Sequence, residues 1–121
     1  MRSERLKGHL DLLLLSVLSR GPGHGYEVIT RLRDRSGGAF ELPEGTVYPA
    51  LHRLEEAGLL ASAWNIVSGR RRRIYRLTVA GETALAEQSQ QWSEFSGSVT
   101  RVLGTPAAIS PRRPALPGVT A

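Results

Sequence analysis

The sequence contains no cysteine and no long apolar segment, and these absences narrow its class before any motif is considered. Without cysteine the chain forms neither a disulfide framework nor a thiolate metal site, so nothing ties it to an oxidising compartment. The longest apolar run, LDLLLLSVL at 10–18, contains Asp11 and is far shorter than the ~20 residues of a membrane-spanning helix. No signal-peptide pattern follows the first methionine. We therefore expect a cytoplasmic protein.

Acidic residues are the minority among the charged ones. The 121 residues include 16 Lys and Arg against 11 Asp and Glu, a net charge of +5. A chain of this length is expected to fold as one domain with a modest core. Its charge favours a polyanionic partner, either nucleic acid or an anionic membrane surface, and the charge alone does not choose between them.

Apolar spacing predicts two helices in the first 38 residues. The first has apolar residues at steps of three and four between Leu6 and Leu18, and Gly21-Pro22 ends it. The second has Tyr26, Ile29 and Leu32 as its apolar stripe and ends at 36–38, Ser-Gly-Gly. We expect Tyr26 to lie in the core with its hydroxyl at the surface.

A third helix is predicted in TVYPALHRLEEAG, with Gly58 ending it. One face of this helix carries Val47, Leu51 and Leu54. A proline is tolerated in the first helical turn, where its missing N–H would have no partner. We therefore expect Thr46 to be the N-cap, which places Pro49 at the third helical position.

Two strands, 60–67 and 70–77, are predicted on either side of a turn at Ser68-Gly69. Centring the turn there pairs Leu60 with Leu77, Ser62 with Tyr75, and Trp64 with Arg73. One face of the hairpin then carries Leu60, Trp64, Tyr75 and Leu77, and its apolar character fades towards the tip.

A long final helix is predicted after Thr78, which can cap it. Residues at steps of three and four form a heptad-like seam: Leu85, Gln88, Trp92, Phe95, Val99 and Val102. We expect the seam to form a dimer interface, with Leu85, Trp92, Phe95, Val99 and Val102 as its apolar residues. Trp92 is either an aromatic knob in that interface or a stacking surface for a flat ligand.

These elements predict a mainly α fold with a small β-hairpin, the plan of a winged helix-turn-helix. We expect a DNA-binding domain of three helices and a two-stranded wing at 1–77 and a dimerisation helix at 78–104. A disordered, proline-rich, basic tail is expected at 105–121. In this plan the third helix enters the major groove of DNA, and the wing lies against the backbone or the minor groove.

Four consecutive arginines, Arg70 to Arg73, stand at the tip of the predicted wing. Strand alternation directs them to both faces, so that any of them can reach a phosphate. Their mutual repulsion is relieved when phosphates neutralise them and counterions are released. A merely solvated hairpin is the alternative, but the preceding three helices favour contact with DNA.

Three stretches resemble the PadR family of bacterial transcriptional regulators: HGYE at 24–27, GTVYPALHRLEEAGLL at 45–60, and GRRRRIYRLTVAG at 69–81. The resemblance implies a cytoplasmic, homodimeric winged-helix repressor whose third helix and wing hold an operator in double-stranded DNA. It also implies that the C-terminal helix forms most of the dimer interface. Some family members respond to phenolic acids or other aromatic compounds, which leaves a small aromatic effector open.

The stretches that match the family supply the candidate DNA-binding residues. Thr46 and Tyr48 are assigned to phosphate, and His52 and Arg53 to phosphate or base edges. Tyr48 has the alternative of packing against the second helix. In the wing, the candidates are Gly69, Arg70, Arg71, Arg72 and Arg73.

No catalytic constellation is recognisable in the sequence. The three histidines, His9, His24 and His52, lie on separate elements, and neither an activated nucleophile nor a glycine-rich phosphate loop is present. We expect no enzyme activity, no metal, no cofactor and no membrane partner. The alternative to DNA binding is a winged-helix interaction module that uses its basic hairpin on an acidic partner.

Overall fold

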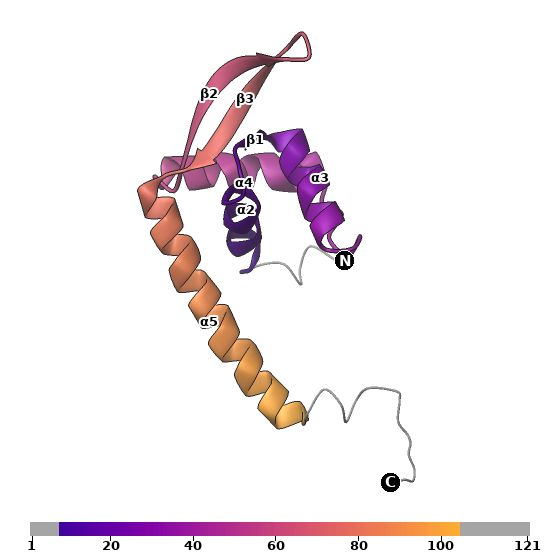
Figure 1. The fold of residues 1–121 in the computed structure, drawn as a ribbon, viewed down its shortest axis with the longest axis vertical. Coiled ribbons are helices and arrows are strands. Elements are labelled where there is room, and N and C mark those ends of the chain that lie inside the picture. Colours follow the sequence, from indigo (N-terminus) through magenta and orange to yellow (C-terminus); the bar gives the residue numbers. More distant parts are fainter. Residues whose placement is uncertain (1–7, 105–121) are drawn as a thin grey trace. The chain divides into compact units, whose positions relative to one another are not determined.

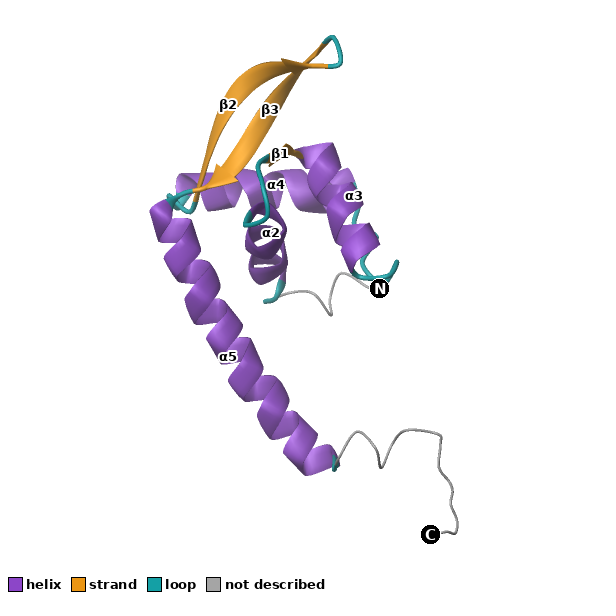
Figure 2. Ribbon diagram, viewed as in Figure 1, coloured by secondary structure: helices purple, strands orange, loops and turns teal. Residues whose placement is uncertain are grey.

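The computed structural model describes residues 8–104, and its three shorter helices, hairpin and long final helix follow the expected order (Figures 1 and 2). The helices and strands are α2 (Leu10–Leu18), β1 (Gly23–His24), α3 (Gly25–Arg35), α4 (Glu44–Glu56), β2 (Leu60–Val67), β3 (Arg70–Leu77) and α5 (Val79–Leu103). The mainly helical winged-helix fold is therefore confirmed. Leu6 of the expected first helix and the expected tail at 105–121 lie outside the described residues. No helix within 8–104 is long and apolar enough to cross a membrane.

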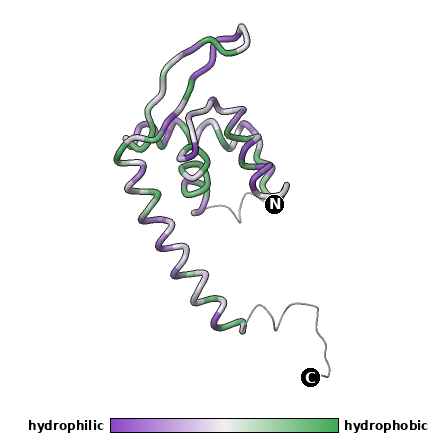
Figure 3. The backbone as a smooth tube through the Cα atoms, in the orientation of Figure 1, coloured by the Kyte–Doolittle hydropathy of each residue, from purple (hydrophilic) through white to green (hydrophobic). Residues whose placement is uncertain are grey.

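The core lies where α2, α3 and α4 meet the base of the wing. Figure 3 shows α2 as hydrophobic along almost its whole length, which fits its place among the other elements. The side chains with the least exposure come from all three helices: Leu14, Leu15, Val17, Val28, Val47, Leu51 and Leu54. Leu60 and Tyr75 of the wing close the cluster. The predicted apolar face of α4, Val47, Leu51 and Leu54, is confirmed by this burial.

The buried face of α3 differs from the expected one. Val28 and Leu32 are buried, whereas Tyr26 is 55% exposed and Ile29 is only partly buried. Two residues turn a helix by about 200°, so once Val28 faces the core, Tyr26 points away from it. The expectation of a core Tyr26 is therefore wrong. Its ring stacks at 6.5 Å on the ring of His24, just before the helix.

The N-terminus of α3 is closed by a reciprocal cap. The His24 ring accepts a hydrogen bond from the backbone N–H of Glu27, and the Glu27 carboxylate accepts one from the backbone N–H of His24. His24 also belongs to β1, which pairs with β3 through Gly23–Tyr75 and His24–Ile74 and makes the sheet three-stranded, in the order β1-β3-β2. A two-residue strand has no alternation to detect, so the sequence did not indicate it.

Helix α4 begins earlier than expected. Its N-cap is Pro43, whose carbonyl accepts hydrogen bonds from the N–H groups of Thr46 and Val47 at 3.0 and 3.1 Å. Thr46 is therefore inside the helix, and Pro49 lies beyond its first turn, so both positional expectations are wrong. The carbonyl that Pro49 leaves without its usual partner belongs to Gly45. Both residues are exposed, so water can satisfy that group while the buried residues on the opposite face hold the helix.

The wing has the predicted register in full. Leu60 pairs with Leu77, Ser62 with Tyr75, and Trp64 with Arg73. Ser68 and Gly69 both have positive φ, 52° and 76°, which is the backbone of a type I′ two-residue turn.

Helix α5 is joined to the wing by a short, well-bonded corner. The Thr78 hydroxyl accepts a hydrogen bond from the N–H of Gly81 at 3.0 Å, which confirms Thr78 as a cap, and donates one to the carbonyl of Gly58. Gly81 is buried against the backbone carbonyl of Leu59, where a side chain would not fit. The chain divides into two units, one up to Gln88 and one from Ser89 onward. Leu85 packs against the core of the first unit.

A close approach between α3 and α4 depends on Gly25. The ring of Tyr48 fills the space that a Cβ atom at position 25 would occupy. Gly25 belongs to the HGYE stretch and Tyr48 to the TVYPAL stretch, so the two sequence motifs meet in one packing contact. Packing of Tyr48 against α3 is therefore observed, which was one of its two interpretations.

We expect Gly25→Ala to lower the free energy of unfolding by about 1–3 kcal/mol, because the added methyl group forces the Tyr48 ring to move. Gly45→Ala is the matched control in α4, since nothing lies within 4 Å of its Cβ position. The control should leave stability unchanged or raise it by up to about 1 kcal/mol. Urea denaturation of both variants measures the difference, and equal stability would contradict this packing constraint.

Candidate nucleic-acid interface

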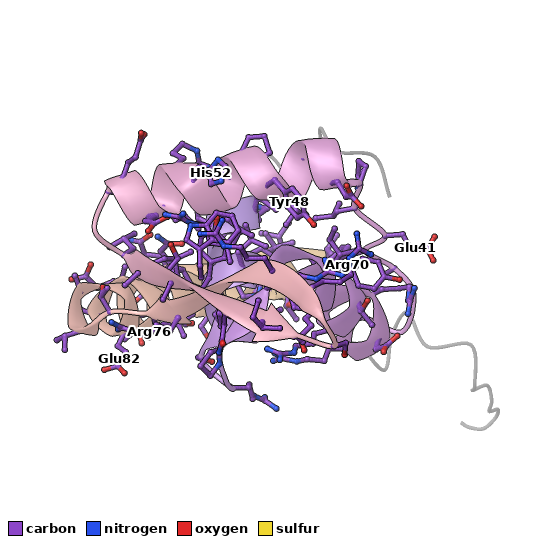
Figure 4. All side chains as sticks on the ribbon, turned by 90° about the horizontal axis from the view of Figure 1, so that it is seen from above. Glu41, Tyr48, His52, Arg70, Arg76 and Glu82 are labelled. Carbon is purple, nitrogen blue, oxygen red and sulfur yellow. The ribbon has the colours of Figure 1, made fainter. Side chains whose placement is uncertain are left out.

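Helix α4 presents a continuous exposed face beside the wing. Pro49, His52, Arg53 and Glu56 are exposed, whereas Thr46 and Tyr48 are half-buried. Figure 4 shows α4 alongside the wing, with His52 and Tyr48 labelled on the helix. The ring of His52 lies 6.5 Å from that of Tyr75 in β3. The four candidate residues of α4 therefore do not share one environment: two are exposed and two are partly packed.

Positive charge is concentrated in the wing and not in α4. Residues 60–77 include five arginines, Arg70 to Arg73 and Arg76, and no acidic residue. Helix α4 carries three glutamates and one arginine. Of these two elements, the wing therefore supplies the electrostatic attraction for a polyanion.

The four consecutive arginines differ in their surroundings. The register places Arg71 and Arg73 on the same face as Ser62 and Tyr75, and Arg70 and Arg72 on the other face. Arg70 and Arg71 are exposed, whereas Arg72 and Arg73 are half-buried. The guanidinium groups of Arg71 and Arg73 lie over the ring of Trp64, at 4.6 and 5.3 Å from its centroid. The sequence indicated the alternation but not this stacking.

Glu55 links α4 to the wing. Its carboxylate oxygen Oε2 accepts a hydrogen bond from the Ser62 hydroxyl at 2.6 Å and a longer one from Arg73 Nη2 at 3.5 Å. Burial raises the pKa of the neighbouring Tyr75, and the charge of Glu55 raises it further. The wing base is thus fastened to α4 by polar contacts as well as by the core. Sequence reasoning missed Glu55 because its partners lie on a separate hairpin.

Arg53 is held by an acidic residue of α2. Its two terminal nitrogens donate hydrogen bonds to the two carboxylate oxygens of Asp11, at 3.0 and 2.9 Å. This bidentate hydrogen bonding, together with the negative charge, raises the pKa of Arg53. Asp11 takes two of the five guanidinium N–H groups, so the arginine keeps donors for a ligand. From the sequence alone, Asp11 is only an interruption of an apolar run.

An open hollow of about 380 Å³ lies between the first turn of α3 and the tip of the wing. Tyr26, Arg31 and Arg72 contribute to its walls. Two nitrogens of Arg31 donate to the backbone carbonyls of Gly21 and Pro22, so this arginine is engaged in holding the segment before α3. Arg72 is the arginine that the wing contributes to this hollow. Within residues 8–104, no group of three or more His, Asp or Glu side chains could hold a metal ion.

The outer part of α5 exposes the apolar seam. Trp92 is 44% exposed, Phe95 60% and Val102 86%, and Val99 is also exposed. The Trp92 and Phe95 rings pack against each other at 6.2 Å between centroids. Four large apolar side chains spaced along one helix form a surface that proteins seldom leave in contact with water.

The fold and this interface define a winged helix-turn-helix protein: three helices and a basic hairpin beside the exposed face of the third helix. The chain belongs to the PadR-like family of transcriptional regulators, whose family model matches residues 14–87. The family consists of regulators and not enzymes, which confirms the expected lack of catalytic activity.

Several individual proteins are similar to this chain. Protein X of Lysinibacillus sphaericus, which is uncharacterised, is 32% identical over 95 residues, covering 78% of this chain and 87% of the relative. Transcriptional regulator Rv3488 of Mycobacterium tuberculosis is 47% identical over 60 residues, about half of each chain (50% and 56%). A PadR family transcriptional regulator from Eggerthella lenta has a similar crystal structure, with a TM-score of 0.73, 36% identity, and coverage of 84% of this chain and 88% of that one.

We expect the ion pair between Asp11 and Arg53 to contribute less than about 1 kcal/mol to stability, because both side chains are substantially exposed, 33% and 56%. A double-mutant cycle of Asp11→Asn and Arg53→Gln, measured by urea denaturation, gives the coupling energy. The coupling should shrink further in high salt. A coupling of several kcal/mol would contradict this expectation and make the pair a main contributor, beside the apolar core, to the packing of α2 against α4.

Proposed function

We propose that this chain is a homodimeric repressor that binds an inverted-repeat operator in double-stranded DNA through α4 and the wing. The observation that carries the proposal is the charge of the wing, five arginines without an acidic residue, beside the exposed face of α4. Membership of the PadR-like family supports it. A polyanion that neutralises these arginines releases counterions, which favours binding.

The two elements have different roles in this proposal. Helix α4 enters the major groove, where His52 and Arg53 reach base edges or phosphates, and Thr46 and Tyr48 lie near the backbone. Gly69 and the arginines of the wing grip phosphates. Because α4 is richer in glutamate than in arginine, its role is to read the DNA, while the wing supplies most of the nonspecific affinity.

Dimerisation is proposed through the seam of α5. Leu85 is partly engaged with the core, which leaves Trp92, Phe95, Val99 and Val102 as the main surface for a second copy. A twofold-symmetric dimer binds two half-sites, which is why the operator is expected to be an inverted repeat. The aromatic pair of Trp92 and Phe95 also suits stacking with a flat compound, so a small aromatic effector would act at this seam and release the DNA.

We expect Arg70→Ala/Arg71→Ala to weaken binding to all DNA sequences similarly, because these two exposed arginines at the tip of the wing contact phosphates in the proposed complex. The log–log dependence of affinity on salt should flatten by about 0.9 for each phosphate that the variant no longer neutralises.

Arg53→Ala should instead cost roughly 1–3 kcal/mol of binding free energy per half-site on the operator if the side chain reaches a base, and much less on random DNA. Both variants are compared with the parent by salt titration on random DNA and on the operator, identified by footprinting upstream of the protein's own gene. If the wing variant keeps the parent salt slope, an acidic protein partner becomes the better explanation of the wing.

We expect Trp92→Lys/Phe95→Lys to be a monomer at micromolar concentration, because it places two charges in the proposed interface. Gln90→Lys/Ser93→Lys is the control, since it adds the same charge to the same helix on the side away from the seam. Light scattering gives the mass of each. If both the seam variant and the control remain dimeric, the seam is excluded as the interface. If the control is also a monomer, added charge anywhere on the helix is enough to prevent dimerisation.

A further inference from the structure

Trp64 is a large aromatic residue in an unusual place, on the outer half of a basic hairpin. Its side chain is 52% exposed, although the apolar residues of the same strand face are buried nearer the base. It does not serve the core, and nothing in the proposed DNA contacts uses it. Its neighbours are the guanidinium groups of Arg71 and Arg73.

The register explains why these two arginines, and not the other two, meet the ring. Trp64 is directly opposite Arg73 across the ladder and diagonal to Arg71, so all three side chains share one face. Ser62 lies on the same face, and its hydroxyl is bonded to Glu55 of α4. The face that carries Trp64 is therefore the one that the wing turns towards α4. Arg70 and Arg72 lie on the opposite face.

The two stacked arginines differ in how many contacts hold their side chains. Arg73 is half-buried, and Glu55 also holds it, so it serves the connection between wing and helix. Arg71 is exposed and closer to the ring centroid, at 4.6 Å. A guanidinium stacked on an indole ring is held by its face, while the N–H groups at its edge remain able to donate hydrogen bonds. Stacking also limits the many rotamers of an exposed arginine before binding.

We propose that Trp64 is a positioning residue for DNA binding: its indole holds the Arg71 guanidinium on the α4-facing side of the wing, ready to donate to phosphates. The DNA strand concerned is the one that passes between the wing and α4 when α4 occupies the major groove. This inference rests on the proposed DNA-binding function. It gives the arginines separate roles, because Arg71 is prearranged by stacking, Arg73 anchors the wing, and Arg70 acts without Trp64.

A double-mutant cycle on DNA affinity tests the inference, with Trp64→Leu as the variant that keeps an apolar side chain but removes the aromatic face. Trp64→Leu is combined with Arg71→Ala and, as the matched control, with Arg70→Ala. We expect Trp64→Leu to lower the affinity for DNA. It should also flatten the log–log slope of affinity against salt, by at most the value of about 0.9 that one phosphate contact contributes. Together with Arg71→Ala it should add less than about twofold to the loss from Arg71→Ala alone.

For Trp64→Leu combined with Arg70→Ala, by contrast, the loss of affinity in the double variant should equal the product of the two single losses to within about twofold. The reason is that the two side chains lie on opposite faces. Multiplying losses in both pairs would overturn the inference and indicate that Trp64 touches DNA by itself. If the double-variant loss is smaller than the product of the single losses for both Arg70 and Arg71, the inference is also overturned, because Trp64 would then stabilise the wing as a whole and not position Arg71. Thermal unfolding of Trp64→Leu shows whether the wing variants remain folded, and a large drop in melting temperature would assign Trp64 a structural role instead.

Failure of the proposed function has a different signature. If neither Arg70→Ala nor Arg71→Ala changes the affinity or the salt slope of an otherwise DNA-binding parent, or if the parent binds no DNA, the wing does not grip phosphates at all. In either case both the proposed function of the wing and the positioning role of Trp64 fall together. If both arginine substitutions weaken DNA binding but neither is coupled to Trp64→Leu in the double-mutant cycle, only the positioning role of Trp64 is excluded.

Discussion

The contact between the Tyr48 ring and the bare backbone of Gly25 fixes how the second and third helices of the domain approach each other. Because any side chain at position 25 would occupy the place of the ring, α3 and α4 can pack this closely only with glycine there. The core leucines and valines stabilise the helices, but apolar burial is not directional. The ring against the glycine selects one arrangement, and that arrangement decides which face of α4 is left exposed.

The wing takes its position from α4. Glu55 accepts hydrogen bonds from Ser62 and Arg73, and Leu60 and Tyr75 enter the core, so the base of the hairpin is fastened on both its polar and its apolar side. Beyond this base the side chains leave the core, and the large apolar ones, Trp64 and Ile66, are exposed. The outer half also carries four consecutive arginines, two of which lie over the ring of Trp64. The hairpin is therefore anchored at one end and strongly charged at the other, which suits an element that meets a polyanion.

Charge in this protein is separated between two neighbouring elements. The exposed face of α4 includes glutamate, and its one arginine is paired with Asp11, whereas the wing has only positive charge. In the proposed DNA complex, such a division would keep general attraction for phosphate on the wing and leave the helix free to discriminate by hydrogen bonding. In the proposed complex, a pairing already present between Arg53 and Asp11 would orient the guanidinium in advance, just as Trp64 would orient Arg71.

Much of the fold followed from the sequence, because it depends on local rules. Helical periodicity located α3 and α5 and the buried face of α4, and the Ser68-Gly69 turn fixed the hairpin register, since a two-residue loop allows one pairing. The order of elements and the run of arginines were enough to indicate a winged helix. The errors at Tyr26, Thr46 and Pro49 were also local: a helical stripe can be shifted by one residue, and the start of a helix depends on which carbonyl accepts its first bonds.

Contacts between residues far apart in the chain were decided only by the tertiary structure. Asp11 with Arg53, Glu55 with Ser62 and Arg73, and Gly25 with Tyr48 join separate elements, and no spacing along the chain connects them. The register puts Trp64 and Arg71 on one face, but only the tertiary structure shows that the guanidinium lies over the ring. The sequence determined every element except β1 (Gly23–His24), and the sign of their charge, because periodicity and composition act within a segment. The structure decided which side chains are held and which remain available, because that depends on how the segments pack.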